Sequence, residues 1–155
     1  MTIRLATLDD APELARLRWE FSPDEAAASG DTFECFRDSF MQFVEQALAS
    51  GVWAIWVAER DGRLIANIWV QIIHKVPRPG RFVTHNSYGY ITNVYADPDV
   101  RGQGIGTRLL GEAVEWTRRQ QAQFVLLWPA AEALPFYERV GFTPIADAVE
   151  VRFDS

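Results

Sequence analysis

Cysteine is almost absent from this sequence, and acidic residues outnumber basic ones. Cys35 is the one cysteine among 155 residues, so no disulfide can form within the chain, and a reducing compartment, the cytoplasm, is expected. Lys and Arg number 15 against 21 Asp and Glu, which gives a net charge of −6. Nucleic acids and anionic membranes bind proteins with a basic surface, so neither is expected as a partner.

Long apolar runs are missing as well. Arg4, Asp9 and Asp10 interrupt the first residues, so no signal peptide is predicted, and no stretch reaches the roughly 18 apolar residues of a membrane span. His, Cys and carboxylate residues do not occur with the spacing of a metal site. Because 155 residues with 48% hydrophobic content suffice for one core, we expect a single domain over residues 1–155.

The glycines are concentrated where the chain passes from an apolar segment into a helix. Gly102, Gly104 and Gly106 lie between a β-rich stretch over residues 88–96 and a helical pattern over residues 107–119. Glycine lacks a Cβ atom, so a ligand can approach the main chain closely there. The first-turn N–H groups of a helix have no internal partner and lie at the positive end of its dipole. This junction therefore predicts an anion site, with phosphate as the favoured anion.

Arg101 and Arg108 add positive charge beside the predicted phosphate site. The sequence does not match the patterns of two familiar phosphate-binding loops. A dinucleotide fingerprint requires glycine where the chain has Thr107 or Leu109, and no lysine precedes Thr107 as a Walker loop demands. A nucleotide-binding α/β domain is thus a weaker alternative, and the hairpin signal Asp61-Gly62 also counts against it.

What remains is the pattern Arg101-x-x-Gly104-x-Gly106. Together with the surrounding segment NVYADPDVRGQGIG and with ALPFYERVGF at residues 133–142, it resembles the GNAT superfamily of N-acetyltransferases. That resemblance implies acetyl-CoA as the co-substrate, and the residue spacing described above predicts no metal. It also implies an α/β (α+β) fold, with a mixed, mainly antiparallel central sheet flanked by helices in the order β-α-α-β-β-β-α-β-α-β-β.

By the same resemblance, main-chain groups of the fourth strand pair with the pantetheine arm of acetyl-CoA, and the glycine loop binds its pyrophosphate. The strand residues are Asn93, Val94, Tyr95 and Ala96. The loop residues are Arg101, Gly102, Gln103, Gly104, Ile105, Gly106, Thr107 and Arg108.

Hydrophobic periodicity and turn residues predict the individual elements. Strands are expected over residues 2–6, 52–58, 64–73, 88–96, 124–128, 142–145 and 149–153. Helices are expected from Asp9 or Asp10 to Phe21, over 33–48 with a phenylalanine-rich face, over 107–119 and over 131–140, with Ser22-Pro23-Asp24 ending the first. In the GNAT superfamily the first two helices and the loop between them cover the acceptor pocket.

Moving an acetyl group from a thioester to an amine requires stabilisation of an oxyanion and a proton for the departing thiolate. Tyr137 matches the tyrosine that lies near the CoA sulfur in the family, and a phenol with a pKa of about 10 can supply that proton. The alternative is that Tyr137 only packs in the core beside Phe136. By resemblance, a main-chain N–H at Val94 or Tyr95 is the expected oxyanion donor.

The general base is not identified by the pattern. Some relatives carry a glutamate in the fourth strand, but Tyr90 stands at that position, and residues 88–96 contain no carboxylate. The alternatives, acting through water, are Glu20, Glu34, His74 and His85, and each also fits a surface or packing role.

The sequence therefore predicts an acetyl-CoA-dependent N-acetyltransferase, which transfers the acetyl group directly to a primary amine. The acceptor is a small-molecule or peptide amine that the sequence does not identify. The alternative is a non-catalytic acyl-CoA-binding sensor or regulatory module of the same fold. Homodimers are frequent in the family, and the sequence identifies no interface for one.

Overall fold

The computed structural model describes residues 1–80 and 86–153 of the chain, so His85 lies outside the described residues. Five strands form one sheet in the order β1-β2-β3-β4-β5. The first four strands pair antiparallel, and β5 pairs parallel to β4. The predicted mixed, mainly antiparallel sheet is thus confirmed. The strands are β1 (Thr2–Leu5), β2 (Trp53–Arg60), β3 (Arg63–His74), β4 (Ser87–Ala96) and β5 (Val125–Leu126).

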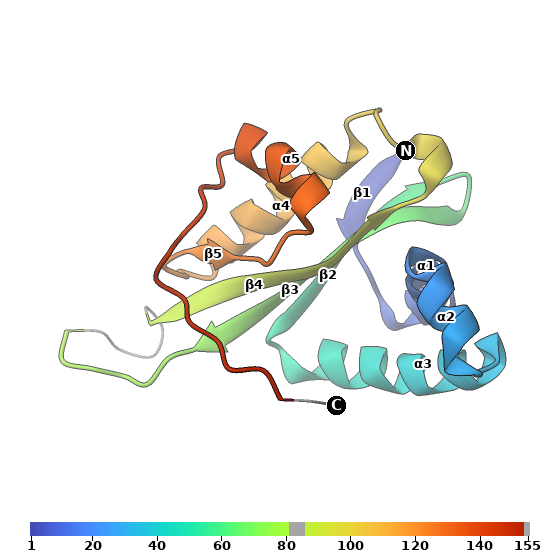
Figure 1. Cartoon of the computed structure of the whole chain (residues 1–155), viewed down its shortest axis with the longest axis horizontal. Helices are drawn as coiled ribbons and strands as arrows, with labels where there is room; N and C mark the ends of the chain where they lie inside the picture. The colour runs from blue at the N-terminus through green and yellow to red at the C-terminus, as the bar shows by residue number, and fades with distance from the viewer. Residues whose placement is uncertain (81–85, 154–155) are drawn as a thin grey trace.

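Helices cover both faces of the sheet (Figure 1). On one face lie α1 (Ala11–Phe21), α2 (Pro23–Ser29) and α3 (Phe33–Ser50), and on the other lie α4 (Ile105–Arg119) and α5 (Leu134–Arg139). Short 3-10 turns precede three of these elements, at Leu8–Asp10, Pro98–Val100 and Ala131–Ala133. No helix among the described residues combines the length and the apolar character that crossing a bilayer requires.

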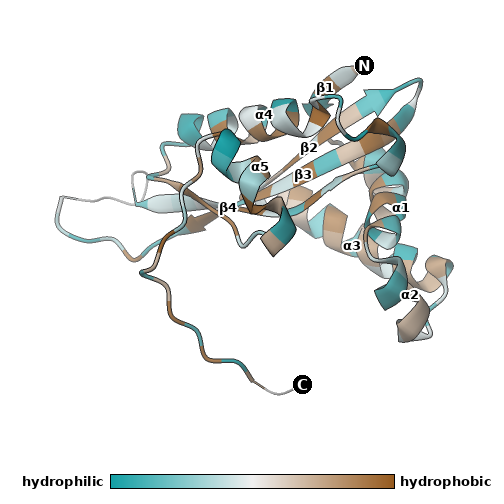
Figure 2. Cartoon of the chain, turned by 45° about the horizontal axis from the view of Figure 1, so that its top comes forward, coloured by the Kyte–Doolittle hydropathy of each residue, from teal (hydrophilic) through white to brown (hydrophobic). Residues whose placement is uncertain are grey.

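Alternation along the strands gives the sheet two hydrophobic cores. In β2, Ile55 and Val57 pack with α1 and α3, whereas Trp56 and Ala58 pack with α4. Side chains of a strand point alternately to its two faces, so a strand covered on both faces is apolar at nearly every position. This explains why the central strands are continuous hydrophobic runs in the sequence. Figure 2 shows the hydrophilic side of α4 turned away from the sheet.

Two features differ from the prediction. Ser22-Pro23-Asp24 ends α1 as expected, but Pro23 also begins α2, because a proline is tolerated in the first turn of a helix. The strands predicted over residues 142–145 and 149–153 are wrong: these residues form no strand. Alternating apolar residues form a strand only where a sheet edge receives them, and within the described residues nothing pairs with the outer edge of the short β5.

A close approach between β4 and α4 fixes how α4 lies on the sheet. A Cβ atom built on Gly89 would lie 2.5 Å from Cγ2 of Thr117, a separation that real Cβ atoms do not show. Thr117 is itself 1% exposed, and its hydroxyl donates to the carbonyl oxygen of Ala113 at 2.8 Å. Gly89 is therefore required by packing, at the point where β4 pairs with Val125 of β5.

We expect Gly89→Ala to lower the free energy of unfolding by about 1–3 kcal/mol, because the new methyl group overlaps Thr117. Thr117→Ser removes the clashing Cγ2 atom, so Gly89→Ala should cost much less stability when it is combined with Thr117→Ser. Urea unfolding measures this by comparing the double variant with Thr117→Ser alone. Gly111→Ala is the control, since its Cβ would meet no atom within 4 Å and should not destabilise the helix. An unchanged unfolding midpoint for Gly89→Ala would contradict this packing.

Candidate functional site

The strands β4 and β5 pair over a very short distance and then separate. Their register contains two pairs, Gly89 with Val125 and Tyr90 with Leu126. Beyond Tyr90 the edge of β4 that faces β5 has no strand partner in the described residues. Main-chain groups on an unpaired edge are free to hydrogen-bond an extended ligand.

A β-bulge lies in the part of β4 that extends beyond its pairing with β5. Thr92 pairs with Trp69 and Tyr95 pairs with Asn67, so two residues of β4, Asn93 and Val94, lie opposite one residue of β3. Asn93 has a φ of 54°, in the left-handed region that asparagine tolerates better than most residues. The bulge increases the local twist of β4 and so contributes to its divergence from β5.

The bulge is held by a buried asparagine on the neighbouring strand. Asn67 is 1% exposed, and its Oδ1 accepts hydrogen bonds from Nδ2 of Asn93 at 3.2 Å and from Nε1 of Trp69 at 2.6 Å. Its own Nδ2 has no partner within the described residues. The prediction missed this role. Two amides, Asn67 and Gln71, interrupt the apolar run of β3, and such an interruption signals a polar role without indicating which amide contacts Asn93.

The glycine loop leaves the first turn of α4 open. Gly102 and Gly104 both have a φ of 78°, and Gly104 directly precedes the helix. Among the described residues no side chain caps this helix, and its first turn carries no acidic residue, so the first-turn N–H groups have no capping partner there. Gln103 joins the loop to its surroundings, since its Oε1 accepts from Arg60 and its Nε2 donates to the carbonyl of Asp99, both at 3.3 Å.

The remaining predicted loop residues divide between core and surface. Ile105 is 3% exposed and packs in the core beneath α4, so only its main-chain N–H is available to a ligand. Thr107 and Arg108 are exposed. Arg101 donates through Nε to the carbonyl oxygen of Ala96 at 3.0 Å, and its guanidinium lies 5.6 Å from the centre of the Tyr95 ring. One of the predicted main-chain groups of β4 is thus already hydrogen-bonded to Arg101.

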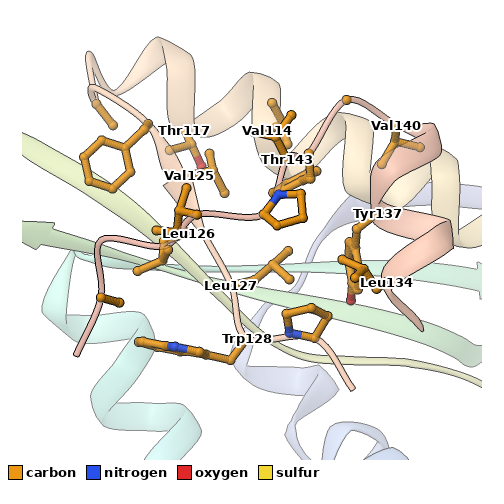
Figure 3. A pocket seen from close by; sticks show the side chains of 18 of the residues that line it. Val114, Thr117, Val125, Leu126, Leu127, Trp128, Leu134, Tyr137, Val140 and Thr143 are labelled. Atoms are coloured by element: carbon orange, nitrogen blue, oxygen red, sulfur yellow. The ribbon is translucent and has the colours of Figure 1, made fainter. Parts of the chain in front are cut away.

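The structure brings α5 against the glycine loop. A Cβ atom built on Gly106 would lie 3.5 Å from Cζ of Phe136, which places the two helices in contact at the first turn of α4. Tyr137 follows on α5, is 6% exposed and packs between Phe136 and Phe142, with ring centres 5.0 and 5.8 Å apart. Figure 3 shows its side chain pointing from α5 toward the same space as Leu127 and Leu134.

Burial raises the pKa of Tyr137 above its ordinary value near 10. The phenol is therefore protonated at neutral pH, which is the form that a proton donor requires. Within the described residues its hydroxyl forms no hydrogen bond with another side chain or carbonyl. Tyr137 is chemically able to supply a proton at this site.

The residues considered as bases lie apart from Tyr137. Glu20 and Glu34 belong to α1 and α3, on the opposite face of the sheet, and Oε2 of Glu20 accepts from Arg16 at 2.8 Å. His74 ends β3, where it pairs with Ser87. Tyr90 packs against Trp128 with ring centres 5.2 Å apart, so the position of the family's glutamate is occupied by an aromatic pair.

Charged residues that the prediction did not single out gather where β4 ends, on the α1 side. Arg16 donates to the carbonyl of Leu64 at 2.7 Å and lies 3.8 Å from Asp97. Tyr95 lies in the same region, and burial followed by the negative charge of Asp97 raises its pKa. Among residues 1–80 and 86–153, no three His, Cys, Asp or Glu residues lie close enough together to hold a metal ion.

The fold and this site define a class of proteins. The model of the Acetyltransferase (GNAT) family matches residues 12–142. The chain belongs to that family, as its resemblance predicted.

Two relatives from sequence comparison are an uncharacterized N-acetyltransferase of Methanocaldococcus jannaschii, 42% identical over 55 residues, and a glucosamine 6-phosphate N-acetyltransferase of Trypanosoma brucei brucei, 33% identical over 88 residues. These matches cover 34% and 57% of the chain, and 24% and 56% of the two relatives, so the chain spans well under two thirds of either. A solved structure of a predicted acetyltransferase with acetyl-CoA, from Clostridium acetobutylicum, has the same fold. Its TM-score is 0.79 at 24% identity, covering 97% of this chain and 95% of that one.

Proposed function

We propose that the chain is an acetyl-CoA-dependent N-acetyltransferase that transfers the acetyl group directly to a primary amine. The observation that carries this proposal is that, within the described residues, the helix start at Gly104 has no side-chain cap and closely follows the end of β4, whose edge toward β5 has no strand partner. The helix start suits a pyrophosphate, and the strand edge suits the amides of a pantetheine arm. Relatives that bear the name N-acetyltransferase support the same activity.

Each part of the site has a distinct role in binding the donor. Gly102 and Gly104 keep Cβ atoms away from the main chain, and the N–H groups of the first turn of α4 donate to the phosphate oxygens. Arg101 and Arg108 supply positive charge, whereas Gln103 orients the loop. Main-chain groups of residues 93–96 align the arm toward Tyr137.

Acetyl-CoA, when bound, supplies the acetyl group as a thioester, whose C–S bond breaks as the amine nitrogen bonds to the carbonyl carbon. The main-chain N–H of Val94 or Tyr95 donates to the acetyl oxygen as negative charge develops there. Tyr137 donates its proton to the departing sulfur and recovers one from solvent. The attacking amine loses its proton to water, because β4 presents no carboxylate to accept it.

The acceptor amine enters from the α1–α3 side of the sheet in this proposal. A glucosamine 6-phosphate N-acetyltransferase among the relatives makes small-molecule amines the first acceptors to examine. Free amines of peptides are the second class.

The proposal is tested by calorimetric titration with acetyl-CoA, followed by a free-thiol release assay over a panel of amines that includes glucosamine 6-phosphate and a short peptide. We expect saturable binding and thiol release that depends on one class of acceptor. ATP and NAD serve as controls and should not bind. Binding without release from any amine would favour the sensor, and a folded protein that does not bind acetyl-CoA would overturn the proposal.

Gly104→Ala should weaken acetyl-CoA binding about tenfold or more, because the added methyl group occupies the space that the pyrophosphate needs. Gly51→Ala is a matched control: Gly51 directly follows α3 with a φ of 75°, and neither glycine has an atom within 4 Å of its would-be Cβ. Both variants should lose about 1–2 kcal/mol of stability from left-handed strain. Equal acetyl-CoA affinities for the two variants would refute the assignment of the loop.

Tyr137→Phe should lower turnover by about a hundredfold or more while leaving the dissociation constant of acetyl-CoA nearly unchanged. The substitution removes the hydroxyl and preserves the ring contacts with Phe136 and Phe142. Tyr88→Phe is the control, since Tyr88 stacks on Phe124 and has no role in the proposed chemistry. Unchanged turnover with a good acceptor would refute the proposed role of Tyr137 as the acid.

A further inference from the structure

A cavity of about 490 Å³ lies among the helices on the α1–α3 face of the sheet. It is formed by the last turn of α1, by α2 and by the two residues that follow α2. These elements lie on the other side of the sheet from α4 and α5 (Figure 1). The lining contains one aromatic ring, Trp19, and two carboxylates, Glu20 and Asp31, and its other residues are alanine, glycine and proline. None of these residues has a role in the proposed binding of acetyl-CoA.

The indole of Trp19 is a fixed aromatic wall of this cavity. It packs against Phe33 and Phe36 of α3, with ring centres 5.8 and 5.3 Å apart and the rings inclined at 65° and 45°. These contacts hold the ring in one orientation, although Trp19 is only half-buried. A cation is attracted to the face of an aromatic ring, and more strongly to tryptophan than to phenylalanine or tyrosine. The wall is therefore suited to a positively charged group.

Negative charge is concentrated in the residues around the cavity. Residues 13–34 contain six carboxylates and two arginines, so they carry −4 of the net charge of −6. Arg16 already pairs with Glu20, since its Nη1 lies 2.8 Å from Oε2. Arg18 pairs with Glu25 at 3.8 Å. The lining that the described residues form contains no basic side chain, so the cavity attracts a cation and repels a phosphate.

The cavity adjoins the place of acetyl transfer in the proposed mechanism. Phe21, directly after Glu20, is 41% exposed and packs against Tyr95 of β4 with ring centres 5.2 Å apart. No described residue of β4 lines the cavity itself, so an amine nitrogen that reacts beside Val94 or Tyr95 lies outside it. A hydrocarbon chain that covers the exposed ring of Phe21 would join the two places. The cavity thus suits the end of an acceptor that is remote from the reacting nitrogen.

We propose that this cavity binds a second ammonium group of the acceptor, and that the acceptor is a diamine or polyamine without a phosphate or carboxylate group. The inference rests on the proposed acetyl transfer and specifies its substrate class. The distal ammonium lies against the ring of Trp19, and Glu20 and Asp31 supply the compensating charge. The attacking nitrogen must be neutral to react, whereas the distal nitrogen stays protonated at neutral pH. The negative charge of the cavity therefore selects the distal end of the substrate.

Two amines of equal length test the second charge. Putrescine and butylamine share a four-carbon chain, and only putrescine has an amine at both ends. In the free-thiol release assay, kcat/KM for putrescine should exceed that for butylamine about tenfold or more, and added salt should reduce this preference. An equal or higher kcat/KM for butylamine would overturn the proposal. A higher kcat/KM for glucosamine 6-phosphate than for putrescine would also overturn it.

Asp31→Asn tests the cavity as the source of that preference. Asp31 is the carboxylate to replace, because Glu20 also pairs with Arg16. The ratio of kcat/KM for putrescine to that for butylamine should fall about threefold or more, the scale of one partly exposed ion pair. Asp24→Asn is the matched control, since Asp24 lies on the neighbouring α2, carries the same charge and does not line the cavity. Equal ratios for the two variants would refute the assignment of the cavity.

Trp19→Leu should lower the same ratio, because leucine has no aromatic face for the distal ammonium. Trp19→Phe keeps an aromatic ring and should retain most of the preference. Circular dichroism checks that both variants are folded, since the indole packs against Phe33 and Phe36. Equal ratios for Trp19→Leu and Trp19→Phe in folded protein would contradict the role of the ring.

Calorimetric titration with putrescine in the absence of acetyl-CoA separates this proposal from the proposed acetyl transfer. Saturable binding that Trp19→Leu weakens, without thiol release from any amine, would leave the cation site standing while the acetyl transfer fails. Thiol release without any preference for putrescine, together with no putrescine binding, would leave the acetyl transfer standing and overturn the cation site.

Discussion

The early separation of β4 from β5 is the constraint on which the rest of the site depends. A parallel strand of ordinary length would hydrogen-bond the edge of β4 up to Ala96 and leave nothing for a ligand. Pairing instead ends at Leu126, and the bulge at Asn93 turns the remainder of β4 aside. Asn67 holds that bulge from within the sheet at the cost of a buried amide nitrogen, Nδ2, that has no hydrogen-bond partner among the described residues. A buried polar contact on β3 thus helps to keep the outer edge of β4 beyond Tyr90 without a strand partner among the described residues.

The glycines act in two physically different ways. Gly102 and Gly104 adopt positive φ in open space, so their importance is conformational. Gly89 has an ordinary φ value, and its importance is steric, because a Cβ atom there would overlap Thr117, whereas a Cβ atom on Gly106 would make only an ordinary contact with Phe136. Gly102 and Gly104 thus shape the loop, whereas Gly89 sets how closely α4 approaches the sheet.

Local signals in the sequence predicted most of the sheet and the start of α4. The turn at Asp61-Gly62, for example, has positive φ at both residues, as that dipeptide favours, and joins Arg60 to Arg63. The prediction of strands over residues 142–145 and 149–153 is wrong because alternation indicates which side chains share a face. It does not indicate which strand they would pair with. The roles of Asn67 and Asp97 depend on strand register and on α1, which no short stretch of sequence encodes. The ligand contacts of residues 93–108 and of Tyr137 stay predictions.

The two cores of the protein lie on opposite faces of a single sheet. The core beneath α4 and α5 contains Tyr137 and Ile105, whereas the core beneath α1 and α3 contains Leu14, Val44 and Trp69. Substitutions in the second core are therefore separated from the glycine loop by the full thickness of the sheet. Under the proposed activity, substitutions in α1–α3, natural or engineered, can change which amine is accepted. The residues that bind the acyl donor can stay the same.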